Sequence, residues 1–185
     1  SSAASDVYKR QQLNNASTLK LIIEKNYMPT KRELAIQAID VEQVVLGAMM
    51  LEKEAVNDTI DILNQDSFYD PKHQYIFKAI LDLFATTKPI DLVTVTAKLQ
   101  KSGELEAAGG AAYISSLTNR VASSAHIQYH ARIISEKFIK RELIRVSSDI
   151  IRDSYNETKD VFDLLNTAES NLFQIAENNM SKQAS

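Results

Sequence analysis

Apolar residues recur at three- and four-residue steps along most of this chain, which predicts a succession of amphipathic helices. Between residues 40 and 121 these helices are short, and strong start and stop signals separate them. Asp70-Pro71 predicts a helix start, because a capping aspartate precedes proline at the first helical position. Asp40 and Asp91 are expected to cap two further helices, and Gly109-Gly110 is expected to turn the chain into another.

Two places in this region are unusual for helices. Residues 93–96 are β-branched and would suit a strand, but the cap at Asp91 and the continuation through Leu99 favour a helix. Gly47 lies in the middle of the helix VEQVVLGAMM, where glycine lowers stability relative to alanine. We therefore expect a neighbouring helix to cross closely at Gly47.

The last third of the chain predicts two long helices. Ser123-Ser124 are expected to cap the first, and neither glycine nor proline interrupts its pattern as far as Tyr155. After a polar break, Asp160 is expected to cap the second helix, whose apolar residues step 4-3-4-3 in a seam typical of coiled coils. The residues of this seam are Val161, Leu165, Ala168, Leu172 and Ile175.

Two long helices with a short connection form an antiparallel hairpin. At about 100° per residue, the large apolar side chains of the first helix fall on several stripes, so burial on several sides is required. The seam covers one stripe, and the other stripes, with Phe162 and Phe173, are left for contact with another protein. The stripes are Ile139, Leu143, Val146 and Ile150; Ile133, Ile144, Ile151 and Tyr155; and Ile127, Ile134 and Phe138.

The predicted fold is therefore all-α, with a compact multi-helix head at residues 40–121 and a long antiparallel helical hairpin at residues 122–178. Residues 1–39 are expected to be a tail that is disordered or partly an artefact of gene assembly, because the chain begins with small polar residues. Residues 179–185 are expected to be a C-terminal tail, the truncated start of a linker.

Composition narrows the possible functions. The sequence contains no cysteine, which excludes disulfides and thiolate zinc sites. No apolar run approaches the roughly 20 residues of a membrane-spanning helix, so we expect a soluble, cytoplasmic protein without a membrane partner. The net charge of −3 is unevenly distributed. Residues 40–120 carry seven basic and twelve acidic side chains, which argues against DNA as their principal partner.

No catalytic, metal-binding or cofactor-binding residue is predicted. The phosphate-binding pattern GxxxxGK[ST] is absent from the sequence, so NTP hydrolysis by this chain is not expected. His126 and His130 are four residues apart and could present two imidazoles on one helix face, but no motif supplies a third ligand. We interpret both as surface histidines and His73 as a structural one.

Six sequence blocks, in order and at compatible spacings, resemble the N-terminal domain of DnaB-family replicative DNA helicases. Each block is a weak signal alone, whereas the ordered set, which extends roughly from Asp40 to Glu177, is specific. Upstream the chain departs from the family pattern, since Met28-Pro29-Thr30 lies farther from the first helix than the family's proline-containing approach. The blocks are VEQVVLGAMM, DSFYDPKHQYIFKAI, KPIDLVTVTAKL, LEAAGGAAYISSL, ASSAHIQYHARII and DVFDLLNTAESNLFQIAE.

The resemblance implies a non-catalytic domain for oligomerisation and primase docking in DNA replication. In this family a helical head precedes a helical hairpin, and hairpins pair between subunits. The dimers assemble as a trimer of dimers, forming a collar on the hexameric motor that also docks the DnaG-type primase. ATP and Mg²⁺ would belong to the motor domain, which this chain lacks. Little or no direct DNA binding and a location in the bacterial cytoplasm are implied as well.

The resemblance also suggests which residues contact partners. Tyr113, Ile144 and Ile150 are expected to contact a partner protein. Each of these positions could equally be a core residue. The residues expected to mediate self-association are Ile133, Ile139, Leu143, Ile151, Phe162 and Phe173.

Three alternatives stay open at the level of sequence. The helicase-binding domain of a primase has a similar helical head and hairpin. A small helical nucleic-acid-binding module would bind DNA in a salt-dependent way. An enzyme with an unrecognised site is the third alternative.

Overall fold

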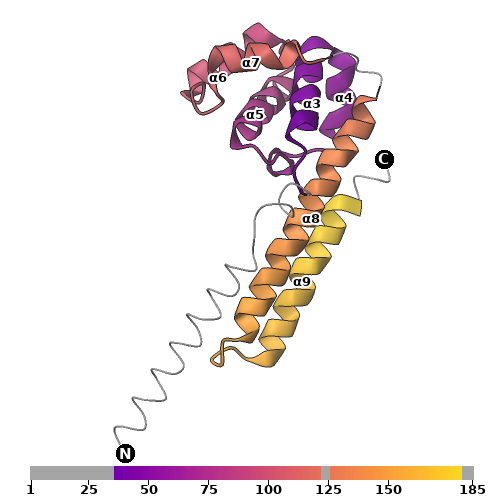
Figure 1. The fold of residues 1–185 in the computed structure, drawn as a ribbon, viewed down its shortest axis with the longest axis vertical. Coiled ribbons are helices and arrows are strands. Elements are labelled where there is room, and N and C mark those ends of the chain that lie inside the picture. Colours follow the sequence, from indigo (N-terminus) through magenta and orange to yellow (C-terminus); the bar gives the residue numbers. More distant parts are fainter. Residues whose placement is uncertain (1–35, 122–125, 181–185) are drawn as a thin grey trace, which may run out of the picture. The chain divides into compact units, whose positions relative to one another are not determined.

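The computed structural model describes residues 36–121 and 126–180, with side chains as far as Glu177. These residues belong to a compact unit that begins at Ile36. Most of the predicted N-terminal tail, the proposed caps Ser123-Ser124 and residues 181–185 lie outside the described residues. Within the described ranges every regular element is a helix, which confirms the all-α prediction (Figure 1).

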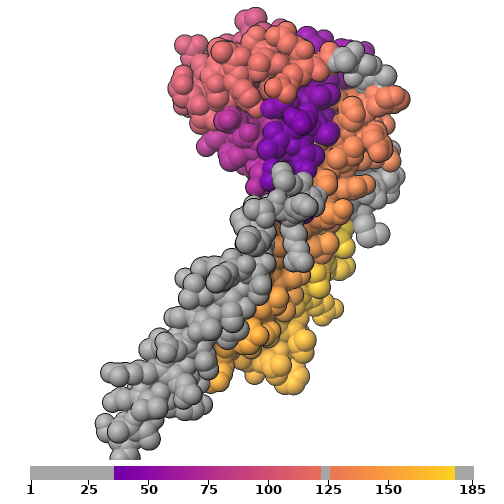
Figure 2. Space-filling view, in the orientation of Figure 1, coloured from indigo at the N-terminus to yellow at the C-terminus, as the bar shows by residue number. Residues whose placement is uncertain are grey.

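Seven α-helices and one short 3₁₀ helix make up this described part, labelled as in Figure 1. They are α3 (Ile39–Leu51), α4 (Lys53–Ile60), η2 (Gln65–Ser67), α5 (Pro71–Ala85), α6 (Leu92–Ser102), α7 (Gly110–Thr118), α8 (Ile127–Ser154) and α9 (Val161–Met180). The helices α3 to α7 form the head, and α8 and α9 run side by side as a hairpin (Figures 1 and 2).

Most of the predicted helix caps are confirmed. The Asp70 side chain accepts a hydrogen bond from the backbone N–H of Lys72, with Pro71 at the first helical position. Asp91 and Thr94 form a reciprocal capping box at the start of α6. The carboxylate of Asp160 accepts hydrogen bonds from the first backbone N–H groups of α9.

The predicted cap at Asp40 is wrong. Helix α3 already begins at Ile39, so Ala38 occupies the capping position and makes no side-chain hydrogen bond there. Apolar Ile39 extends the helical pattern one residue upstream of the aspartate. Asp40 lies instead in the first turn, where its negative charge still interacts favourably with the helix dipole.

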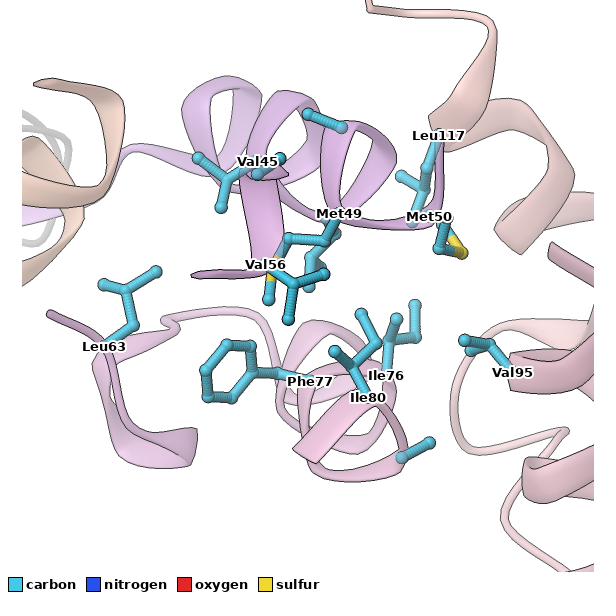
Figure 3. Close-up of a cluster of buried hydrophobic side chains, with 14 of the residues drawn as sticks. Val45, Met49, Met50, Val56, Leu63, Ile76, Phe77, Ile80, Val95 and Leu117 are labelled. Carbon is cyan, nitrogen blue, oxygen red and sulfur yellow. The ribbon is translucent and has the colours of Figure 1, made fainter. Parts of the chain in front are cut away.

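Helix α3 is the centre of the head. It contacts α4, α5, α6, α7 and α8, and its residues Val45, Leu46, Ala48 and Met49 are fully buried. Figure 3 shows its side chains facing those of α5, among them Phe77 and Ile80. Helix α5 is also largely buried, but α3 contacts more of the other helices.

Gly47 marks the point where α7 crosses α3. A Cβ atom built on Gly47 would lie 2.3 Å from the carbonyl oxygen of Leu117 and 2.8 Å from Cγ2 of Val121. Both distances are far shorter than any normal contact, so no side chain fits here. The expected close crossing at this glycine is confirmed.

Helix α8 is shared by the head and the hairpin. Ile127, Ala131 and Ile134 in its first part are buried in the head core, and α8 contacts α3 and α4. Its second part pairs with α9 (Figure 1). The head core therefore extends beyond residue 121 into the region that sequence analysis assigned to the hairpin.

The predicted seam on α9 is correct only in part: Ala168 and Ile175 lie on the less exposed side of the helix, whereas the other three seam residues do not. Val161, Leu165 and Leu172 are exposed, with 58%, 60% and 44% of their surface accessible. The apolar arc of α9 covers about half of the helix circumference, from Leu164 round to Phe173, so a 4-3 spacing alone does not determine which edge faces α8. The least exposed residues of α9 are Leu164, Ala168, Asn171 and Ile175.

Candidate partner-binding surfaces

The hairpin exposes most of the apolar residues that sequence analysis assigned to partner contacts. Phe162 and Phe173 on α9 are 71% and 63% exposed, and Ile151 on α8 is 52% exposed. Leu143 and Ile144 are exposed to a smaller extent. The remaining three, Ile133, Ile139 and Ile150, are partly buried.

These exposed residues occupy one broad face and both outer edges of the hairpin. Val146 is buried in the hairpin part of α8, so we take it as the residue of α8 that faces α9. Ala168, on the less exposed side of α9, is taken as the residue that faces α8. In two antiparallel helices, positions rotated in the same sense from the contact line lie on the same face. At about 100° per residue, Leu143 on α8 and Leu165 and Leu172 on α9 therefore share one face. Ile144 and Ile151 on α8 are rotated farther from the contact line and lie at one outer edge of the hairpin. Phe162 and Phe173 on α9 lie in the same way at the other outer edge.

The opposite face of the hairpin is polar. On α8, Arg145 pairs with Glu142 at 2.9 Å and with Asp149 at 3.2 Å, and Arg152 pairs with Asp149 at 2.8 Å. Hydrogen bonds to Glu142 raise the pKa of Arg145 above its ordinary value. Exposed ion pairs of this kind contribute little stability, but they keep this face hydrated. The hairpin is thus apolar on one face and charged on the other.

Tyr113 lies in the head, on α7, and is half-buried. Its hydroxyl is 2.7 Å from Nε2 of His73 and accepts a hydrogen bond of 3.3 Å from Nε2 of Gln43. Burial raises the pKa of this tyrosine. Ile144 and Ile150 belong to the hairpin part of α8, well away from α7 in Figure 1. The three predicted partner contacts therefore lie on two separate surfaces, one in the head and one in the hairpin.

Sequence analysis missed two polar residues that organise the head. Glu42 is 1% exposed and contacts His73, and half-buried Arg141 donates hydrogen bonds to the backbone carbonyl groups of Ser67 and Ile36. An acidic residue among apolar neighbours in VEQVVLG was the available signal for Glu42. Arg141 had no such signal, because its acceptors are backbone groups distant in sequence.

The described residues allow the histidine pair to be placed and the helices to be searched for membrane-spanning segments. His126 is exposed and precedes α8, and His130 is partly buried in its first turn. No group of three candidate metal ligands occurs among the residues with a described position. In the same part of the chain, no helix is both long and apolar enough to cross a bilayer.

Comparison with known proteins agrees with this architecture. Residues 35–136 match the family described as the DnaB-like helicase N terminal domain. The replicative DNA helicase DnaB of Rhodothermus marinus is 45% identical over 148 residues, which are 80% of this chain and 16% of that protein. The replicative DNA helicase DnaC of Bacillus subtilis (strain 168) is 40% identical over 141 residues, 76% of this chain and 31% of that protein.

Two solved structures are similar as well. The N-terminal domain of DnaB helicase from Mycobacterium tuberculosis superposes with a TM-score of 0.71 at 35% identity, covering 76% of this chain and 98% of that one. A DnaB-like replicative helicase, whose structure was described with its interactions with primase, gives a TM-score of 0.62 at 27% identity. That match covers 75% of this chain and 31% of the helicase.

The chain thus spans between 16% and 31% of the length of these two curated relatives. Both relatives are helicases, which favours the helicase over the primase alternative. The part that corresponds to this chain is the helicase's non-catalytic N-terminal domain. The chain belongs to the DnaB-like helicase N-terminal domain family.

Proposed function

We propose that this domain mediates oligomerisation and primase docking for a replicative DNA helicase in the bacterial cytoplasm. The observation that carries the proposal is the exposed apolar face and edges of the hairpin. Large apolar side chains exposed together on a folded domain usually mark a protein–protein interface. In this domain they lie on the element that pairs between subunits in the family which the sequence resembles.

The apolar surface is large enough to drive association. Burying a leucine, isoleucine or phenylalanine side chain stabilises by roughly 1.5–3 kcal/mol. Leu143, Ile151, Leu165, Phe162 and Phe173 are all exposed in the isolated chain. The burial free energy of five such residues on each of two copies exceeds the lower estimates of the free-energy cost of association, which is about 4–15 kcal/mol. A symmetric contact between two hairpins would bury the same face twice.

Light scattering and sedimentation of the 185-residue chain across a concentration series test self-association. Phe173→Asp introduces a charge at the apolar edge of α9, and we expect it to shift the protein toward monomer. Gln174→Asp is the matched control, because Gln174 is also exposed, lies in the same turn and belongs to the polar side. A wild-type chain that stays monomeric at high concentration would contradict this part of the proposal.

Primase docking is tested by calorimetric titration with the primase of the same organism. Ile144→Asp adds a charge at an exposed position on α8, and we expect weaker primase binding or weaker self-association with unchanged helicity. Separate measurement of oligomeric state assigns the loss to one function or the other. Loss of the whole fold would show instead that Ile144 is a core residue.

A further inference from the structure

A chain of polar side chains crosses the head from α3 through α5 to α7. Nδ1 of His73 is 2.6 Å from Oε2 of Glu42, and Nε2 of His73 is 2.7 Å from the hydroxyl of Tyr113. Glu42, His73 and Tyr113 are here called the polar triad. Its first two members are 1% and 0% exposed, whereas Tyr113 is only half-buried. The triad therefore connects the interior of the head with its surface.

The inner end of the triad is held firmly. Oε1 of Glu42 accepts a hydrogen bond of 2.7 Å from the backbone N–H of Tyr69, and Oε2 accepts one of 3.3 Å from that of Asp70. These donors belong to the turn that precedes α5. A buried carboxylate is tolerated only when such partners replace water. Glu42 consequently ties α3 to the start of α5.

The hydrogen bond to Glu42 also determines which ring nitrogen of His73 carries the proton, and so which nitrogen is left to bond to Tyr113. A carboxylate can only accept, so Nδ1 of His73 carries the proton. A neutral imidazole with its proton on Nδ1 accepts at Nε2, and the hydroxyl of Tyr113 lies within hydrogen-bond distance of this atom. The two rings are nearly parallel, with an interplanar angle of 11° and centroids 6.1 Å apart.

The inner part of the Tyr113 ring also has little room to move. A Cβ atom built on Gly109 would lie 2.8 Å from Cδ1 and 3.0 Å from Cγ of Tyr113, so the glycine backbone packs against the end of the ring nearest the main chain. Nζ of Lys72 lies 5.1 Å from the ring centroid, a cation–π contact from α5. With the hydroxyl bound at one end of the ring and Gly109 packed against the other, the exposed surface of Tyr113 has one defined orientation.

We propose that Glu42 and His73 are positioning residues for Tyr113, and that they prepare the head surface around this tyrosine for primase binding without contacting the primase. The second half of this statement rests on the proposed function. The first half, the fixed orientation of the Tyr113 ring, is a property of the isolated chain. The two halves can therefore be tested separately.

The test combines calorimetric titration with primase and NMR of the chain labelled at tyrosine ¹³Cζ, a carbon that senses the hydrogen bonds of the hydroxyl. The sequence has seven tyrosines, and Tyr113→Phe identifies the relevant signal. His73→Gln is expected to shift that signal and to lower primase affinity roughly threefold to tenfold, the effect of one hydrogen bond. In the Tyr113→Phe background, His73→Gln is expected to cause no further loss. Tyr75→Phe, a hydroxyl deletion on α5 outside the triad, is the control.

The outcomes separate the two halves. An unchanged ¹³Cζ signal in His73→Gln, or an equal loss of affinity in both backgrounds, would overturn the positioning role. If His73→Gln fails to fold, Tyr113→Phe decides, because it removes only the hydroxyl: wild-type affinity overturns the proposal, and lowered affinity with an altered ¹⁵Nε2 signal of His73 supports it. If the wild-type chain does not bind primase, the proposed function is wrong, while the ¹³Cζ response to His73→Gln still tests the positioning of Tyr113.

Discussion

At Gly47 the backbone of one helix and the end of another meet without space for a side chain. The nearest obstacle is the carbonyl oxygen of Leu117, which belongs to the backbone of α7 and cannot rotate away. An added methyl group would therefore push the two helices apart. Because α3 contacts all the other α-helices of the head, this displacement would disturb side-chain packing throughout the core.

We expect Gly47→Ala to lower the free energy of unfolding by about 1–3 kcal/mol, as for other overpacked sites. This holds although alanine is the better helix former. Chemical denaturation followed by circular dichroism measures the change. Val93→Ala, at an exposed position inside α6, is the control and should stay within about 0.5 kcal/mol of wild type. A stabilised Gly47→Ala protein would show that α3 and α7 are not in close contact.

Glu104 gives the head a dependence on pH. A hydrogen bond from Lys78, at 2.6 Å, and another from Ser102 lower the pKa of this carboxyl. A carboxyl with a lower pKa in the folded state stabilises the fold above its ordinary pKa, and the contribution is lost as the pH falls through the lowered value. We expect Glu104→Gln to be less stable than wild type at neutral pH and equally stable in acid. Thermal unfolding at a series of pH values checks this, and a constant difference at all pH values would contradict it.

Single residues also show where sequence reasoning ends. The caps at Asp70, Asp91 and Asp160 were predictable because each cap acts on backbone groups two or three residues away. The pairing of Glu42 with His73, thirty-one residues apart, was not. Periodicity places a residue on a helix face, but the partner opposite that face is determined only by how the helices pack.

Among the elements, α8 shows how one side chain can join two parts of a fold. Arg141 lies between its head part and its hairpin part. The guanidinium donates hydrogen bonds to the carbonyl oxygen of Ser67 at 2.7 Å and to that of Ile36 at 3.1 Å, and it also lies over the Tyr69 ring. Burial lowers its pKa, although nearby Glu42 acts in the opposite direction. Arg141 thus fastens η2 and the start of the described chain to α8.

We expect Arg141→Gln to destabilise the protein by about 1–3 kcal/mol, because it leaves partly buried carbonyl groups without a donor. Hydrogen exchange should become faster in residues 65–69 and remain unchanged in α9. Arg145→Gln, which removes only exposed ion pairs, is the control and should have little effect. Equal exchange in wild type and Arg141→Gln would exclude the fastening role.

The rotation of the seam leads to a prediction for helix α9. Ala168 is on the less exposed side of α9, whereas Leu165 is exposed. We expect Ala168→Asp to disrupt the pairing of α9 with α8 and to lower helicity. Leu165→Asp should retain helicity and reduce self-association. Circular dichroism and sedimentation distinguish the two variants. Loss of helicity in both variants would restore the seam predicted from sequence, because that seam contains Leu165 as well as Ala168.

For the whole described unit, the division into head and hairpin runs through a helix and not through a loop. Sequence analysis placed the boundary at residue 121, where Ser123-Ser124 resemble a helix start. Side-chain patterns identified two long helices there, but the depth to which the first one is buried in the head depends on Ile127, Ala131 and Ile134 meeting α3 and α4. Such contacts between distant segments are not encoded in local periodicity.

We therefore expect a shortened chain, residues 36–142, to fold as an intact head that stays monomeric. It retains the buried part of α8 and Arg141, and it lacks α9 and the exposed half of α8. Amide NMR spectra test the fold, and light scattering tests the mass. A shorter chain ending at residue 121 should not fold, since it loses three core side chains. A self-associating head would place the interface outside the hairpin.

Because α8 is continuous from the head core to the turn before α9, a tilt of its buried end moves its far end over a larger distance. Its 28 residues span roughly 42 Å at about 1.5 Å per residue. Tilting the seated end by about 10° would displace the far end by roughly 7 Å, a swing comparable to the spacing between packed helices. A small adjustment among the core side chains of the head would thus be amplified into a large change in where the tip of the hairpin points.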